Sequence, residues 1–216
     1  MSTLCIVHVN LEGNRVPSES TTTTICFVRH GETDWNRNNR YQGWADTPLN
    51  ATGLAQAKLV AQVIAGESWD AIVSSPLSRA FQTAQAIADA SPELGHIEQD
   101  PDLRARGYGE AEGLTLAERE ARWDGPGWPG LEPWEVMAQH ANAALERIAR
   151  KHAGKRVLVV SHGGLMNAVQ TSISGGDVGS GITVILNTAR TTLLHDVSGW
   201  TIETVTDVSH LEMAVR

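Results

Sequence analysis

Short apolar runs alternate with amphipathic stretches along most of the chain. The runs have the length and the β-branched content of buried strands, and the stretches that follow them repeat apolar residues with helical spacing. The pairs are 25–28 with 54–65, 69–75 with 78–90, and 156–161 with 164–173. Thr52 stands where it would cap the helix predicted over 54–65. Alternation of this kind is typical of a mostly parallel sheet covered by helices.

The rest of the pattern adds one long helix and a strand-rich end. Apolar positions recur with helical spacing from near Pro133 to Gly154, which is placed to end that helix. The segments 183–187, 191–197 and 199–207 are predicted to be strands joined by turns. We therefore predict an α/β fold, a three-layer sandwich with a mostly parallel central sheet flanked by helices.

The chain divides into a short extension and one domain. Residues 1–22 combine a strand-like stretch, Leu4–Val9, with a polar tract that has no helical period, and we interpret them as an N-terminal extension. Residues 23–216 suffice for a single domain with its own core. Within it, residues 123–134 contain Gly, Pro and three tryptophans. This composition indicates an ordered loop or lid, or equally a loop anchored by Trp packing.

The net charge and the cysteine content indicate which kinds of partner and which cellular compartment to expect. With 17 Lys and Arg against 25 Asp and Glu the net charge is −8, which argues against a nucleic acid or a membrane surface as the partner. Cys5 and Cys26 are too few for a disulfide framework and have no metal-ligand spacing, so a cytoplasmic location fits best. Neither a signal peptide nor an apolar run long enough to span a membrane is recognisable.

Basic and imidazole side chains follow three of the predicted strands. Arg29 and His30 follow the first, Arg79 comes soon after the second, and His162 follows the strand at 156–161. Carboxyl ends of parallel strands share one edge of a sheet, so these side chains are expected to meet there. Guanidinium groups bind phosphoryl oxygens in bidentate fashion and an imidazole can attack phosphorus, so the set predicts phosphoryl chemistry without a metal.

Three motifs carry a resemblance to a known family. The strings RHGETDWNRNNRYQGWADTPLNATGLAQA, SSPLSRAFQTA and VSHGG occur in this order, and a DVSHL segment follows near the C-terminus. From about residue 24 to residue 210 the chain resembles the histidine phosphatase superfamily, the phosphoglycerate-mutase-like proteins. The resemblance implies that His30 is a nucleophile that becomes phosphohistidine, and that Arg29, Arg79 and His162 complete the phosphate pocket.

The same resemblance assigns positions around the substrate and implies no cofactor. Asn36, Gln42 and Gly43 match positions that line the phosphate or the substrate. Gly163, at a strand-to-helix junction, is placed to add backbone N–H donors. The expected partner is a small phosphorylated metabolite, and a homodimer is compatible with the sequence.

The chain departs from the family where a proton donor is expected. The family pattern L-x-E-x-x-[YF]-G matches residues 103–109, with Ala105 in place of the Glu. A positioned acid typically contributes about a hundred- to ten-thousand-fold to the rate, so phosphorylation of His30 is expected to be slow unless Glu110 or Glu112 takes over. A natural loss of rapid turnover and a substitution made to trap a ligand are both consistent with alanine here.

Hydrolysis is favoured over phosphoryl transfer between metabolites. Mutases of the family resemble the same core with a longer insertion and a Lys at the position of Leu116. The predicted function is therefore phosphomonoester hydrolysis, with a cofactor-dependent phosphoglycerate mutase or a phosphate-ester-binding protein with little turnover as alternatives. The Trp-rich segment hints at a flat or apolar leaving group. The arginines at 104, 106, 119 and 122 either recognise a second anionic group or form a solvated face.

Overall fold

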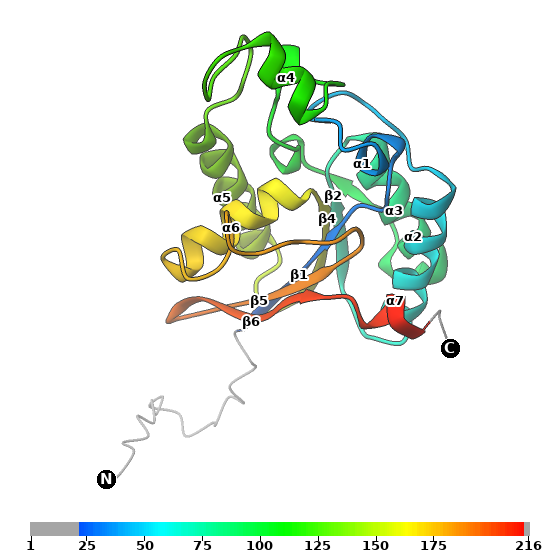
Figure 1. Cartoon of the computed structure of the whole chain (residues 1–216). Coiled ribbons are helices and arrows are strands. Elements are labelled where there is room, and N and C mark those ends of the chain that lie inside the picture. Colours follow the sequence, from blue (N-terminus) through cyan, green and yellow to red (C-terminus); the bar gives the residue numbers. More distant parts are fainter. Residues whose placement is uncertain (1–21, 214–216) are drawn as a thin grey trace, which may run out of the picture.

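A six-stranded sheet forms the middle of the computed structural model, which describes residues 22–213 (Figure 1). Its strands are β1 (Thr23–Arg29), β2 (Ala71–Ser74), β3 (Glu98–Gln99), β4 (Arg156–Ser161), β5 (Arg190–Asp196) and β6 (Gly199–Asp207), arranged in the order β3-β2-β4-β1-β5-β6. The strands from β3 to β1 are parallel, and β5 and β6 are antiparallel additions at one edge. The prediction of a mostly parallel sheet is confirmed.

Helices cover both faces of this sheet. The α-helices of the described part of the chain are α1 (Asp34–Arg37), α2 (Ala51–Ile64), α3 (Ser78–Ala90), α4 (Leu116–Arg122), α5 (Trp134–Lys151), α6 (Gly163–Ser174) and α7 (Ser209–Met213). Helices α2 and α3 lie on one face, and α5 and α6 on the other (Figure 1). Successive residues of a strand point to opposite faces, so β1 supplies Ile25 and Phe27 to one core cluster and Cys26 and Val28 to the other. This is the three-layer sandwich that the alternation predicts.

The helix cap predicted at Thr52 is wrong. Helix α2 begins at Ala51, and its N-cap is Asn50, whose side chain accepts a hydrogen bond from the Gly53 N–H at 2.8 Å. The Thr52 hydroxyl instead accepts a hydrogen bond from Arg37 at 2.9 Å. The apolar pattern starts late because most of the first turn of this helix is exposed, so periodicity alone places the beginning too far along the chain.

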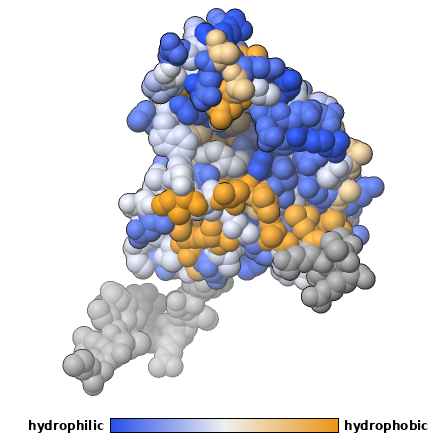
Figure 2. All heavy atoms as spheres, viewed as in Figure 1, coloured by the Kyte–Doolittle hydropathy of each residue, from blue (hydrophilic) through white to orange (hydrophobic). Residues whose placement is uncertain are grey.

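The predicted strand at 183–187 is also wrong, because this segment belongs to the irregular connection between α6 and β5. Side chains take its carbonyl groups: Arg29 donates to the Ile185 oxygen, and Asn167 donates to the Thr183 oxygen at 3.2 Å. Alternate apolar residues of the connection are exposed, namely Ile182 (61%), Val184 (77%) and Leu186 (51%). Figure 2 shows apolar residues gathered in this region. The segment 183–187 therefore alternates between exposed and buried residues as a strand does, but it does not pair with a strand of the sheet.

The predicted extension over residues 1–22, with the strand-like stretch Leu4–Val9, lies outside the described residues apart from residue 22. None of the described helices combines the length and the apolarity that a membrane crossing requires.

Candidate active site

His30 and His162 lie side by side at the carboxyl edge of the sheet. They follow the neighbouring parallel strands β1 and β4, in which Arg29 pairs in register with Ser161. The centroids of the two imidazole rings are 5.1 Å apart, and both residues are buried. The two imidazoles therefore meet where the order of motifs predicts.

A backbone carbonyl group fixes the orientation of the His30 ring. The ring Nδ1 lies 2.7 Å from the carbonyl oxygen of Gly31. Since a carbonyl oxygen only accepts, Nδ1 carries the proton and Nε2 keeps its lone pair. Burial lowers the pKa of His30 well below its ordinary value, and the charges of Arg79 and Arg29 lower it further. At neutral pH the His30 ring is therefore neutral, with a lone pair on Nε2.

The two arginines of the site are held by backbone carbonyl groups. Arg29 donates from Nη1 to the Ile185 oxygen. Arg79 donates to the oxygens of Ala45 and Gly43 at 2.9 and 2.8 Å. Burial lowers the pKa of each arginine to about 10, so both remain cationic at neutral pH. Among the described residues neither arginine has a carboxylate oxygen within 4.0 Å, which leaves both charges available to an anion.

Three buried nitrogen atoms of this cluster have no hydrogen-bond partner in the described part of the chain. They are Arg29 Nε, Arg79 Nε and His162 Nδ1. The other His162 nitrogen, Nε2, is hydrogen-bonded to the Ser75 hydroxyl at 2.9 Å. Burial lowers the pKa of His162 well below its ordinary value, and Arg79 lowers it further. A buried polar group without a partner costs about 1–3 kcal/mol, and an oxyanion bound between these side chains would accept their hydrogen bonds.

Two amide side chains add donors to the same cavity. Gln42 Oε1 accepts hydrogen bonds from the hydroxyl groups of Thr33 and Thr47, both at 2.9 Å. Asn36 Oδ1 accepts one from the Thr33 N–H at 3.2 Å, within the capping box that starts α1. Because each amide oxygen is engaged, each amide nitrogen has protons left for a ligand. Both side chains line the cavity, as predicted.

Gly43 also lines the cavity, and it packs tightly against Glu112. Its φ is +55°, and a Cβ there would lie 2.0 Å from Glu112 Oε1. The Glu112 carboxylate accepts hydrogen bonds from the N–H groups of Trp44, Ala45 and Tyr108 at 2.8, 2.7 and 3.1 Å. This carboxylate joins two loops, and its engagement removes it as a candidate proton donor.

Gly163 begins α6 next to Arg29 and does not itself line the cavity, whereas Gly164 does. A Cβ at Gly163 would lie 3.5 Å from both Cδ and Nε of Arg29. The helix that starts here has 12 residues, and His162 is its N-cap. Its free N–H groups and its dipole favour an anion at this end. The backbone donors at this helix start stay a prediction, with Gly164 rather than Gly163 in the cavity wall.

Ala105 forms part of the cavity wall, and no Asp or Glu of the described residues does. The alanine is 8% exposed. Glu110 lies outside the cavity, in an exposed ion pair with Arg122 at 3.4 Å. Neither Glu110 nor Glu112 therefore lies in the cavity wall beside Ala105.

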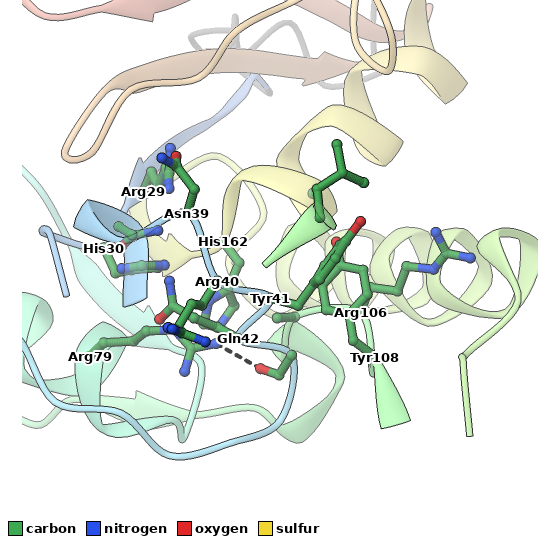
Figure 3. A pocket seen from close by; sticks show the side chains of 15 residues that line it. Arg29, His30, Asn39, Arg40, Tyr41, Gln42, Arg79, Arg106, Tyr108 and His162 are labelled. Atoms are coloured by element: carbon green, nitrogen blue, oxygen red, sulfur yellow. Dashed lines mark hydrogen bonds between the residues drawn. The ribbon is translucent and has the colours of Figure 1, made fainter. Parts of the chain in front are cut away.

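No part in the site was predicted for the two tyrosines in the far wall of the cavity, whose volume is about 320 Å³, although both lie in the matched motifs. This wall contains Tyr41 and Tyr108, with ring centroids 4.9 Å apart, and the half-exposed Leu116. Figure 3 shows Arg29, His30 and Arg79 on one side of the pocket and Tyr41, Tyr108 and Arg106 on the other, with His162 and Gln42 between them. The wall arises from pairing of two distant loops: Tyr41 N–H donates to the Leu114 oxygen at 2.9 Å.

Two further arginines reach the cavity wall, but other groups hold both of them. Arg40 donates from Nη1 to the Gly113 oxygen at 2.6 Å and to Glu118 at 3.0 Å. Arg106 donates from Nε to the backbone carbonyl oxygen of Glu132 at 2.7 Å, and in Figure 3 its side chain extends away from His30. Of the four arginines that the sequence offers for a second anionic group, only Arg106 lines the cavity.

The Trp-rich segment packs behind the cavity and does not line it. The Trp128 indole donates to the Tyr108 carbonyl oxygen at 2.7 Å, and Trp123 stacks on Trp128 with ring centroids 6.4 Å apart. None of the three tryptophans of residues 123–134 is a wall residue. The packing interpretation of this segment is confirmed, and the aromatic surface next to the site is that of Tyr41 and Tyr108.

The fold and the site together define an α/β protein in which two buried histidines and two arginines form a basic cluster at the carboxyl edge of the sheet. Within the described residues no group of three or more His, Cys, Asp or Glu side chains is arranged to hold a metal ion. The model of the histidine phosphatase superfamily (branch 1) matches residues 25–208. The chain belongs to this superfamily.

Similar proteins include phosphatases. The chain is 39% identical over 194 residues to a protein described as uncharacterized phosphatase PhoE of Bacillus subtilis, a match that covers 90% of this chain and 100% of that protein. It is 37% identical over 213 residues to a metal-independent phosphoserine phosphatase of Arabidopsis thaliana, over 91% of this chain and 86% of that one. The solved structure of Bacillus stearothermophilus YhfR superposes with a TM-score of 0.79 at 28% identity, over 88% of this chain and 99% of that one.

Proposed function

We propose that this protein hydrolyses phosphate monoesters through a phosphohistidine on His30. The observation that carries the proposal is a neutral, buried imidazole beside His162 and two arginines that have no carboxylate oxygen within 4.0 Å among the described residues. A phosphoryl group bound there would accept hydrogen bonds from Arg29, Arg79 and His162. Membership of the superfamily and the phosphatases among the similar proteins support hydrolysis.

The reaction takes two steps. In the first, the lone pair of His30 Nε2 forms a bond to phosphorus while the bond from phosphorus to the leaving oxygen breaks, and that oxygen keeps the electron pair. In the second, a water oxygen attacks phosphorus, its spare proton passes to solvent, and the N–P bond breaks to release inorganic phosphate. The fixed cations stabilise the charge on the phosphoryl oxygens in both steps.

Water is the proposed acceptor of the phosphoryl group. Leu116 lines the cavity at the position where the resemblance places a Lys in mutases, so a second phosphate-binding cation is missing there. With Ala105 in the wall, the first step proceeds without a positioned carboxylic acid and is slowed by about a hundred- to ten-thousand-fold relative to a site that has one.

The test is to trap the phosphoenzyme. The protein is mixed with 4-nitrophenyl phosphate, quenched, and analysed by mass spectrometry for an acid-labile phosphate on His30, while released phosphate is measured without added bisphosphoglycerate. We expect the adduct and the release in the parent chain, and neither in His30→Asn. The matched control His96→Asn, at an exposed histidine, should keep both. Ester binding without any adduct would instead identify a binding protein.

A further inference from the structure

The cavity lacks a group suited to protonating a leaving oxygen at neutral pH. No carboxylate lines it among the described residues, and its titratable wall residues are arginines, the two histidines, Tyr41 and Tyr108. His162 is neutral because burial lowers its pKa. Burial raises the pKa of Tyr108 above its ordinary value, which makes its phenol a weaker acid.

Without such a group, the nature of the leaving oxygen decides the rate. An alkoxide is about as strong a base as hydroxide and is a poor leaving group unless it receives a proton. A phenolate and a carboxylate are far weaker bases, since their conjugate acids have pKa values of about 10 and about 4. The electron pair can therefore stay on a phenolate or carboxylate oxygen without a proton, whereas an alkoxide needs one.

The wall around Ala105 also favours a flat group. The rings of Tyr41 and Tyr108 lie 4.9 Å apart at a tilt of 51°, and Leu116 adds an apolar side chain beside them. The rings are held in place because the Tyr108 main chain is bound by Glu112 through its N–H and by Trp128 through its carbonyl group. A rigid aromatic wall of this kind offers contact area to a planar leaving group.

We propose that the substrates of this site are aryl and acyl phosphates, whose leaving groups depart as stabilised anions past Ala105 and the wall of Tyr41 and Tyr108. This inference rests on the proposed phosphohistidine chemistry at His30. In the step concerned, the N–P bond forms, the P–O bond breaks, and the leaving oxygen takes its proton from solvent only after it has departed.

The first experiment measures kcat/KM for acetyl phosphate, 4-nitrophenyl phosphate, phenyl phosphate and glycerol 3-phosphate. We expect the values to fall steadily as the leaving oxygen becomes more basic, with a loss of at least about a hundredfold from 4-nitrophenyl to glycerol phosphate, which is the lower end of what a positioned acid contributes. Equal values for the aryl and the alkyl ester would overturn the inference.

The second experiment places a carboxylic acid at position 105. Ala105→Glu should raise kcat/KM for glycerol 3-phosphate by about a hundredfold or more while changing that for 4-nitrophenyl phosphate by less than about tenfold. Its activity on the alkyl ester should decline as the pH rises through the pKa of the new carboxyl group, which then loses its proton. The matched variant Ala105→Gln, of equal size without an acid, should show neither change.

Two outcomes separate this inference from the proposed function. If 4-nitrophenyl phosphate leaves no phosphate on His30, the phosphohistidine proposal fails. If the adduct forms at the same rate from the aryl and the alkyl ester, only the leaving-group inference fails. Tyr108→Phe completes the test, since a selective loss of alkyl-ester activity would make that phenol the acid and overturn the inference, even if Ala105→Glu does not fold.

Discussion

The neighbours of Gln42 hold its amide oxygen and leave its amide N–H groups available to an anion. Two threonine hydroxyl groups hold its Oε1, which leaves its amide N–H groups for the cavity. Gln42→Glu keeps the size of the side chain but places a carboxylate where the phosphoryl group should bind. We expect the Kd for inorganic phosphate to rise at least about tenfold, because like charges in an enclosed site repel each other strongly.

Isothermal titration calorimetry with inorganic phosphate measures this change. Gln99→Glu alters the net charge of the protein equally, but at an exposed position on β3, and it should leave the Kd within about twofold. A similar loss of affinity in both variants would show that overall charge, rather than the position of Gln42, sets the affinity.

At this scale, the sequence predicts the residues that lie in continuous motifs. Arg29, His30 and Gln42 fall within one string, and the structure places all three at the cavity. It does not predict Asn187, whose amide donates to the His30 carbonyl oxygen at 2.9 Å across 157 positions of the chain. Such a contact depends on where the α6–β5 connection returns, and no local pattern encodes that return.

At the scale of elements, two loops form the cavity by pairing with each other. The loop after α1 and the loop before α4 exchange backbone hydrogen bonds between Tyr41 and residues 113 and 114, at 2.8 and 2.9 Å. The Glu112 carboxylate adds a second connection to the same pair of loops. Gly43 stands at the contact, where its positive φ and the nearby carboxylate leave no room for a Cβ.

Gly43→Ala should therefore displace Glu112 and loosen both loops. We expect a loss of about 2–4 kcal/mol in the free energy of unfolding, of which about 1–2 kcal/mol is the cost of an L side chain in the left-handed region. The control is Gly175→Ala, because this glycine lies in the left-handed region with a φ of +67° and has open space around its Cβ position. Urea unfolding of both variants isolates the contact, and equal losses would contradict the role given to Glu112.

The elements themselves were predictable where periodicity and tertiary structure agree. The helix over 78–90 and the strand over 156–161 have the predicted bounds, because most of their buried positions are apolar. The segment 183–187 has the composition of a strand, yet Arg29 and Asn167 donate hydrogen bonds to two of its carbonyl groups, and only Ile185 of its apolar side chains is buried. Strand pairing is non-local, so composition alone could not reveal this.

At the scale of the whole molecule, an acidic protein encloses a basic pocket. The net charge is −8, while the described wall of the cavity has arginines and histidines and no carboxylate. The sequence predicts this contrast through its motifs, but the degree of burial comes only from the folded structure. Burial keeps His30 and His162 neutral, and this has a consequence for stability that can be measured.

The free energy of unfolding should fall as the pH drops below about 6.5. In the folded protein the pKa values of His30 and His162 lie well below their ordinary value of 6.5, whereas in the unfolded chain they return to it. Between the two values the unfolded chain binds protons that the folded chain does not, so stability decreases with falling pH. Each histidine contributes a slope of up to about 1.4 kcal/mol per pH unit.

Variants separate this effect from the titration of carboxylates. Urea unfolding at a series of pH values from 7.5 to about 5 measures how the free energy of unfolding of the parent chain depends on pH. His30→Asn should reduce this slope by up to about 1.4 kcal/mol per pH unit, the contribution of one bound proton. The exposed His96→Asn should leave the slope unchanged. Inorganic phosphate should also counter the decline, because a bound anion favours protonated imidazoles in the folded state. An identical slope in His30→Asn and the parent would mean that burial does not lower the pKa of His30. The imidazole would then become protonated at mildly acidic pH, and the neutral nucleophile on which the proposed chemistry depends would be lost.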